Sequence, residues 1–158
     1  PQLLGGGHEK GLRAGTQNVP AIVGFGEAAK IAKDEMEQDS RHANELRDEF
    51  LRLLTESLDN IEVNGSLTKR IPGNLNLLFK GIDAVWLLGR INTKLAVSLS
   101  SACHSASSTP SHVLKAIGLS EAEQRSSVRF GFGRFNTKAE VISAAESIIE
   151  AQQNCKTP

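Results

Sequence analysis

Residues 61–79, IEVNGSLTKRIPGNLNLLF, contain the change of hydrophobic period that decides the fold class. Apolar and polar side chains alternate at the start of this stretch and again in NLNLLF, which is the period of a half-buried β-strand. Pro72 and Gly73 stand between the two runs and favour a turn. The stretch therefore predicts two short strands, one beginning at Ile61 and one around Leu75.

The sequence upstream of this stretch has the period of a helix. Asn18 precedes Val19 and Pro20, which is a helix cap followed by proline in the first turn. The apolar stripe continues to its last members, Leu46, Phe50, Leu53, Leu54 and Leu58. A pattern of about 40 residues is long for a compact domain, so we expect either a break near residues 37–44 or a helix that bridges two domains. The glycine-rich residues 1–16 predict a shaped loop.

Short helices and strands alternate downstream of residue 79. Residues 95–99 and 127–132 have the pattern of a third and a fourth strand, and the segment 98–111, rich in Ser, Ala and Thr, predicts a long loop. Three helix starts are indicated by capping residues: Asp83, Ser111 (before a short helix that ends at Gly118), and Asn136 or Thr137. This mixture predicts a small α+β sandwich, in which helices cover a sheet.

Composition excludes several classes of function. The chain has 18 basic and 18 acidic residues, so it does not indicate the broad basic surface of a nucleic-acid binder. No stretch approaches the roughly 20 apolar residues that span a bilayer. Two cysteines far apart in a chain of 158 residues do not make a disulfide framework, which favours a reducing compartment. The sequence starts with neither a methionine nor a signal peptide, and we expect it to be part of a longer polypeptide.

Cys103 lies in the predicted loop, in the string SLSSACHSASSTPSHVL. A long loop inside a compact domain favours a functional thiol, whereas a half-buried cysteine without a role is the structural alternative. His104 is adjacent, but neighbouring side chains point in different directions, so adjacency alone does not establish a Cys/His dyad. Zinc binding fails on the number and spacing of ligands, and no metal site is predicted.

The glycine-rich loop differs from the nucleotide-binding motifs. Leu12 stands where a Walker loop requires lysine, and the glycine spacing of a dinucleotide turn is absent. Thr16 is followed closely by a helix N-terminus, where its hydroxyl and backbone N–H groups could bind an anion. The alternative is a loop whose Thr16 or Asn18 only caps the helix.

Arg129 is a charged residue in the predicted strand SSVRFGFGRF. It could lie on the exposed side of an edge strand. Alternatively, its planar fork of donors could bind a substrate carboxylate at two points, which suits arginine better than lysine.

Three motifs in this order, GGGHEKGLRAGTQN, SSACHSAS and SSVRFGFGRF, resemble the long-loop cysteine desulfurases that supply sulfur for iron–sulfur clusters and nitrogenase. The resemblance covers essentially the whole chain. It implies the fold of type I pyridoxal-phosphate enzymes, which are homodimers with a large cofactor domain and a small C-terminal domain. Residues 1–34 would be the end of the large domain, and residues 35–158 the small α+β domain with the catalytic cysteine loop at about 98–111.

The resemblance also implies a role for three residues. Cys103 matches the cysteine whose thiolate takes sulfur from L-cysteine, which leaves L-alanine and a persulfide. Arg129 matches the arginine that pairs with the substrate carboxylate. Thr16 matches the threonine that reaches the phosphate of pyridoxal 5'-phosphate across the dimer interface.

The family's cofactor lysine has no counterpart among the lysines of this sequence, so we expect the chain alone to be inactive. Expected partners are L-cysteine, a second copy of the protein and an iron–sulfur scaffold or other sulfur acceptor, with neither nucleic acid nor membrane. The expected compartment is the bacterial cytoplasm or an organellar matrix or stroma. Two other functions remain open: a non-catalytic module that accepts persulfide or binds a scaffold, and a selenocysteine lyase.

Overall fold

The computed structural model describes residues 2–99 and 111–154 of the chain. The chain divides into two units, Pro1–Glu37 and Gln38–Pro158, each of which is described by itself. The division lies close to the domain boundary expected at residues 34–35, and whether the units correspond to the two expected domains stays a prediction.

The first unit begins with a loop that is closed by its own backbone. The N–H of Gln2 donates to the carbonyl of Leu12 over 2.9 Å, and the N–H of Ala14 donates to that of Leu3 over 3.3 Å. A short 3-10 helix, η1 (Glu9–Gly11), lies in the sequence between these two hydrogen-bonded segments of the loop. The predicted shaped loop is therefore confirmed, with one irregular helical turn inside it.

A single helix, α1 (Val19–Ser57), follows the loop. The side-chain oxygen of Asn18 accepts a hydrogen bond from the N–H of Ala21 over 3.2 Å, which confirms the predicted cap. The helix runs through residues 37–44 without the break that was one of the two expectations, because residues 27–57 contain neither proline nor glycine. The division between the two units falls inside α1, as the other expectation allowed.

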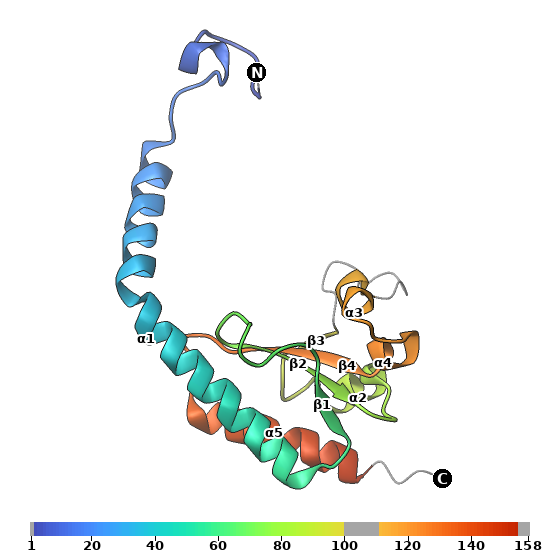
Figure 1. Ribbon diagram of the computed structural model, residues 1–158. Helices are drawn as coiled ribbons and strands as arrows, with labels where there is room; N and C mark the ends of the chain where they lie inside the picture. Colours follow the sequence, from blue (N-terminus) through green and yellow to red (C-terminus); the bar gives the residue numbers. More distant parts are fainter. Residues whose placement is uncertain (1, 100–110, 155–158) are drawn as a thin grey trace. The chain divides into compact units, whose positions relative to one another are not determined.

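The second unit is built on a four-stranded antiparallel sheet (Figure 1). Its strands are β1 (Ile61–Val63), β2 (Asn74–Phe79), β3 (Ser98–Leu99) and β4 (Ser127–Gly131), in the spatial order β1-β2-β4-β3. Both strands predicted from residues 61–79 are present, and they pair with each other. β2 and β4 form the middle of the sheet, so side chains on these two strands have neighbours on both sides.

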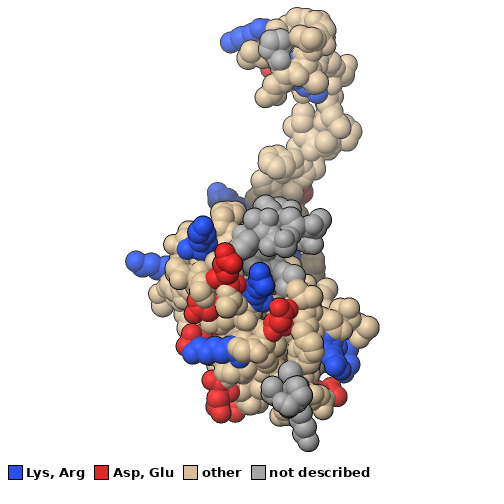
Figure 2. All heavy atoms as spheres, turned by 90° about the vertical axis from the view of Figure 1, so that its right-hand side faces the viewer, with Lys and Arg blue, Asp and Glu red and all other residues tan. Residues whose placement is uncertain are grey.

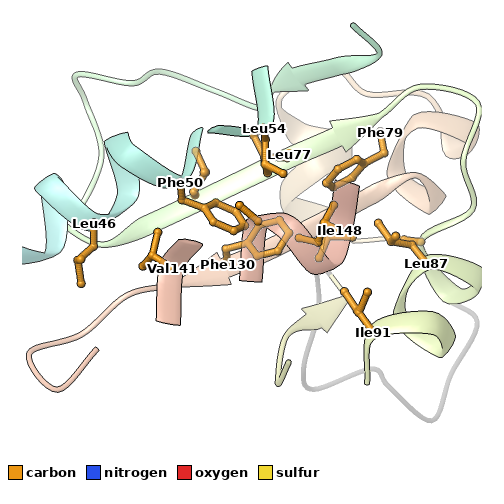
Figure 3. Packing of buried hydrophobic residues seen from close by; sticks show 14 residues of the cluster. Leu46, Phe50, Leu54, Leu77, Phe79, Leu87, Ile91, Phe130, Val141 and Ile148 are labelled. Carbon is orange, nitrogen blue, oxygen red and sulfur yellow. The ribbon is translucent and has the colours of Figure 1, made fainter. Parts of the chain in front are cut away.

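Three helices cover one face of this sheet: residues 38–57 of α1, α2 (Ala84–Ile91) and α5 (Lys138–Gln153). Alternation in β2 directs Leu75, Leu77 and Phe79 to that face. They form one buried cluster with apolar residues of β4 and the three helices, among them Phe50, Phe130 and Ile148 (Figure 3). The ring centroids of Phe50 and Phe130 lie 4.9 Å apart. The predicted fold class, a small α+β arrangement with helices on a sheet, is confirmed.

The helix caps read from the sequence are also present. Asp83 accepts hydrogen bonds from the first turn of α2, Ser111 caps α3 (His112–Ala116), and Thr137, rather than Asn136, caps α5 in a capping box with Glu140. The sequence reading missed α4 (Glu121–Arg125). Its signal was a second capping box, formed by Ser120 and Glu123.

The third strand is shorter than residues 95–99, the predicted range. Only Ser98 and Leu99 pair with β4, opposite Arg129 and Val128. Residues 95–97 instead line a cavity of about 330 Å³ with Phe130 and the first turns of α5. Because this segment stands apart from β4, its backbone cannot form the ladder that an alternating sequence alone would favour.

The surface of the second unit is mixed in charge. On the face that Figure 2 shows, basic and acidic side chains are interspersed rather than gathered into regions of one sign. This pattern agrees with the equal numbers of basic and acidic residues in the chain. Among the described residues, no helix is both long enough and apolar enough to cross a membrane.

Candidate functional site

Arg129 lies on β4, between two buried residues whose side chains both point to the opposite face of the sheet from that of Arg129. Val128 and Phe130 point into the core, and Phe130 faces Leu75 across the ladder. Arg129 therefore points to the other face of the sheet, where it is half-buried. β4 is an inner strand, so the edge-strand alternative for this arginine is wrong. An arginine in the middle of a sheet needs polar neighbours.

Two polar residues flank Arg129 on the neighbouring strands. Ser98 on β3 is its cross-strand partner on one side, and its hydroxyl accepts a hydrogen bond from the arginine Nη2 over 3.1 Å. Asn76 on β2 is its cross-strand partner on the other side. The three residues form a polar row across the sheet, which we call the Arg129 row. This row is on the face opposite the apolar core.

A second polar group adjoins the Arg129 row. Asn64, which is 7% exposed, donates from Nδ2 to Asn76 Oδ1 over 2.7 Å and to Ser127 Oγ over 2.9 Å. The sequence reading did not single out Asn64 or Asn76. The available signal was the alternation in NLNLLF, which puts Asn74 and Asn76 on the face opposite Leu75 and Leu77.

Arg70 holds the loop that carries Asn64. Its guanidinium donates to the backbone carbonyls of Ser66, Asn74 and Asn64. Burial lowers the pKa of Arg70 below its ordinary value, and the nearby positive charge of Arg47 lowers it further. Those three carbonyl acceptors offset the cost of burying the cation, and they fix the backbone on both sides of the turn between β1 and β2.

Thr16 belongs to the first unit, just before α1. Arg13 Nη1 donates to the carbonyl of Gly15 over 2.7 Å and to that of Thr16 over 3.3 Å. The acceptors of this turn are therefore occupied. Within the described part of the chain, the Thr16 hydroxyl and the N–H groups of residues 16–18 have no hydrogen-bond partner.

The turn at Thr16 thus presents exposed hydrogen-bond donors beside the N-terminus of α1, which is the positive end of the helix dipole. This donor set fits an anionic group such as a phosphate. The sequence expectation for Thr16 is compatible with this geometry. Thr16 and Arg129 lie in different units, and the structure describes each only within its own.

Cys103 lies outside the described residues, as does most of the predicted loop. Its role as the sulfur-accepting residue stays a prediction from the sequence. The described strand β3 ends at Leu99, so Ser98 of the Arg129 row precedes Cys103 by five positions in the sequence. Among residues 2–99 and 111–154, no group of three or more His, Cys, Asp or Glu side chains could hold a metal ion.

Comparison with known proteins identifies the family. The family model for aminotransferase class-V matches residues 6–143, which is most of the chain and includes Thr16, Cys103 and Arg129. This chain belongs to the aminotransferase class-V family.

Two curated relatives of this chain are named cysteine desulfurases. Cysteine desulfurase IscS of Anaeromyxobacter sp. (strain Fw109-5) is 47% identical over 149 residues, which cover 94% of this chain and 37% of that protein. Cysteine desulfurase IscS of Stutzerimonas stutzeri (strain A1501) is 47% identical over 150 residues, covering 95% and 37%. The resemblance read from the three motifs is confirmed.

Two solved structures share the fold. A NifS-like protein matches with a TM-score of 0.80 at 29% identity, over 98% of this chain and 39% of that one. A NifS-like protein from Rickettsia africae ESF-5 matches with a TM-score of 0.79 at 27% identity, over 97% and 40%. These matches confirm the expected type I pyridoxal-phosphate fold. The chain spans about two fifths of the length of these curated relatives and solved structures.

Proposed function

We propose that this chain is the C-terminal part of a pyridoxal-phosphate-dependent cysteine desulfurase, which converts L-cysteine to L-alanine and leaves a persulfide on Cys103. The observation that carries the proposal is the Arg129 row. A half-buried guanidinium is held by Ser98, the strand residue that leads into the cysteine-bearing segment. The curated names of the relatives agree with this reading.

Arg129 binds the carboxylate of the amino-acid substrate in this proposal. One donor of its guanidinium is engaged with Ser98, and the planar group keeps further N–H donors for two carboxylate oxygens. Its partial burial strengthens such a pair, because fewer water molecules compete for the charge. Holding the carboxylate fixes where the substrate sulfur lies.

Thr16 and the N–H groups around it bind the cofactor phosphate in this proposal. The donor-rich turn before α1, whose carbonyls Arg13 occupies, supports that assignment. Pyridoxal phosphate, when bound, supplies an electron sink for bond cleavage at the amino-acid substrate. Residues 1–34 would complete the large cofactor domain and residues 35–158 the small domain.

Cys103 carries the sulfur-transfer step. Its thiolate attacks the sulfur of the bound cysteine, an S–S bond forms and the substrate C–S bond breaks. The substrate carbon takes up a proton and becomes the methyl group of alanine. The electron pair of the broken C–S bond stays on the substrate carbon, so the carbon is reduced while the two sulfurs are oxidised to the persulfide. The thiol hydrogen of the substrate stays on the outer sulfur, and no external oxidant is needed.

The whole protein would act as a homodimer that passes the persulfide sulfur to an iron–sulfur scaffold or another acceptor protein. The compartment we propose is the bacterial cytoplasm or an organellar matrix or stroma. Bacterial relatives and a small number of cysteines favour a reducing location of this kind.

The test uses the full-length protein with pyridoxal phosphate and L-cysteine. Alanine and sulfide release are measured for the unsubstituted protein, for Cys103→Ser, and for Cys155→Ser as a matched control. Alanine formation that Cys103→Ser abolishes and Cys155→Ser leaves intact supports the proposal. Undiminished sulfide release by Cys103→Ser means that Cys103 is not the acceptor, and a selenocysteine lyase then becomes the better assignment.

A second variant examines Arg129. Arg129→Lys keeps the positive charge but loses the planar fork, and we expect kcat/KM for cysteine to fall about a hundredfold. A protein that binds no cofactor and releases no alanine, but accepts sulfur from a persulfide donor on Cys103, would instead be a non-catalytic sulfur-transfer module.

A further inference from the structure

A chain of hydrogen bonds leads from α4 to the Arg129 row. It begins at the backbone carbonyl of Glu123, which accepts a bond from the Ser127 hydroxyl over 2.7 Å. A serine hydroxyl has one proton, and this bond uses it. The Ser127 oxygen can therefore only accept from its other neighbour, Asn64, at 2.9 Å.

The direction of donation at Ser127 determines the orientation of the Asn64 side-chain amide. The atom of Asn64 that contacts Ser127 must be the nitrogen Nδ2, because Ser127 has no proton left to donate. The second hydrogen of Nδ2 is donated to Asn76 at 2.7 Å. Asn64 is 7% exposed, so a reversed amide would leave buried polar atoms without hydrogen-bond partners. The series of hydrogen bonds from Glu123 to Asn76 therefore has one stable direction of donation.

The same logic determines the orientation of Asn76. The atom that accepts from Asn64 must be Oδ1, so the other terminal atom of Asn76 is the donor Nδ2. Within the described residues, Asn76 Nδ2 has no hydrogen-bond partner, and the residue is half-buried rather than enclosed. Asn76 thus presents an N–H₂ group, and its amide oxygen already accepts one hydrogen bond from Asn64.

Asn76 and Arg129 are directly opposed on β2 and β4. Directly opposed side chains have Cβ atoms about 4.5–5.5 Å apart and share one face of the sheet. The guanidinium of Arg129 also offers donors only. Apart from the Ser98 hydroxyl, which accepts from Arg129 Nη2, these two donor groups have no acceptor among the described residues, and a carboxylate, which offers acceptors only, complements both.

We propose that Asn76 is a second substrate-binding residue, whose Nδ2 donates to the amino-acid carboxylate held by Arg129, and that buried Asn64 fixes this orientation. This inference rests on the proposed function, because the ligand of Arg129 is taken to be the substrate carboxylate. It assigns Asn76 a direct contact and Asn64 a positioning role.

The test is a double-mutant cycle in the full-length protein with pyridoxal phosphate. The dissociation constant of L-alanine, which carries the carboxylate, is measured from the change in cofactor absorbance. The same titration with ethylamine, which lacks the carboxylate, shows whether the rest of the site is intact. Four proteins are compared: the unsubstituted protein, Asn76→Ala, Arg129→Ala and the double variant.

A direct contact predicts that Asn76→Ala weakens L-alanine binding about tenfold and leaves ethylamine binding unchanged. In the Arg129→Ala background, the Asn76 substitution should still weaken L-alanine binding several-fold. If it has no effect there, Asn76 acts only by positioning Arg129, and the proposal is overturned. Unchanged L-alanine binding in the single variant would overturn it as well.

Two further variants guard against a folding effect. Asn74→Ala is the matched control, since Asn74 lies on the same face of β2 but opposite Gly131, and L-alanine binding should be unaffected. Asn76→Ser keeps an oxygen to accept from Asn64, and it should lose affinity like Asn76→Ala while retaining the thermal midpoint. Alanine formation from cysteine by the unsubstituted protein tests the proposed function separately, because L-alanine binding does not depend on turnover.

Discussion

Arg129 on β4 and Ser98 on β3 are cross-strand partners, and the arginine Nη2 donates to the serine hydroxyl over 3.1 Å. Ser98→Ala removes this bond and frees the guanidinium to adopt other rotamers. We expect KM for L-cysteine in the full-length protein to rise about threefold to tenfold, the range for one hydrogen bond. Steady-state kinetics measure the change. Ser143→Ala, on exposed α5 surface, is the control, and equal effects of the two substitutions would contradict the role of Ser98.

Phe50 is at the centre of the aromatic cluster, 1% exposed, with ring centroids 4.9 Å from Phe130 and 5.4 Å from Phe132. Phe50→Ala should lower the free energy of unfolding by about 3–5 kcal/mol, because it leaves a cavity in the core. Urea denaturation followed by circular dichroism measures the loss. Phe135 is 90% exposed, and Phe135→Ala should change the free energy by less than about 0.5 kcal/mol.

Gly73 lies at the start of β2 with a φ of 67°, and a Cβ added there would stand 2.2 Å from the carbonyl oxygen of Phe132. The N–H of Phe132 donates to the Gly73 carbonyl over 2.7 Å, so the two backbones cannot separate without losing that bond. Gly73→Ala should therefore lower the thermal midpoint markedly.

Gly81 is a control that distinguishes the effect of backbone strain from that of a steric clash. It has a similar φ of 77°, but a Cβ there would meet nothing within 4 Å. Gly81→Ala should cost only about 1 kcal/mol, from the backbone conformation alone. Equal decreases of the thermal midpoint in Gly73→Ala and Gly81→Ala would mean that the close contact with Phe132 does not add to the destabilisation.

Two capping boxes predict a dependence of stability on pH. The Ser120 hydroxyl, followed by the Ser120 N–H, lowers the pKa of Glu123, and the Thr137 N–H, followed by its hydroxyl, lowers the pKa of Glu140. A carboxyl with a lower pKa in the folded state stabilises the protein above its unfolded pKa of about 4.3. This contribution is lost as the pH falls through the folded-state pKa.

The variants Glu123→Gln and Glu140→Gln keep a hydrogen-bond acceptor at each cap but remove the titration. We expect the unsubstituted protein to have the higher thermal midpoint at pH 6, and the difference to shrink as the pH is lowered to about 3. Glu146→Gln, on the same helix as Glu140 but outside a cap, is the control. If the difference in thermal midpoint stays constant between pH 6 and about pH 3, the titration of the two capping glutamates is not its cause.

Local features were predictable from the sequence because the groups involved are within a few positions of one another. The sequence predicts helix starts at Asn18, Asp83, Ser111 and either Asn136 or Thr137. In the structure Asn18, Asp83, Ser111 and Thr137 each accept a hydrogen bond from the first turn of the helix. The two strands of residues 61–79 followed from alternation alone. The capping box before α4, formed by Ser120 and Glu123, is a local signal of the same kind.

The candidate site was predictable only in its residue types. Arg129 attracted attention because a charge among apolar strand residues needs a partner, and the three motifs in order indicated the family. Its partners were not predictable, since Ser98 is 31 positions away and pairs with it only through the order of the strands. The reading of residues 95–97 as strand was wrong for the same reason, because pairing requires a neighbouring strand within reach.

The sequence by itself therefore determined the helix starts, the class of fold and the family, because periodicity, caps and ordered motifs are properties of the chain alone. Tertiary structure decided which polar residues meet. Asn64 and Ser127 are 63 positions apart, and the direction of their hydrogen bond, which sets the amide of Asn76 beside Arg129, exists only once β1, β2 and β4 are assembled. A hydrogen bond depends on distance and angle between groups, and no local pattern specifies either across that separation.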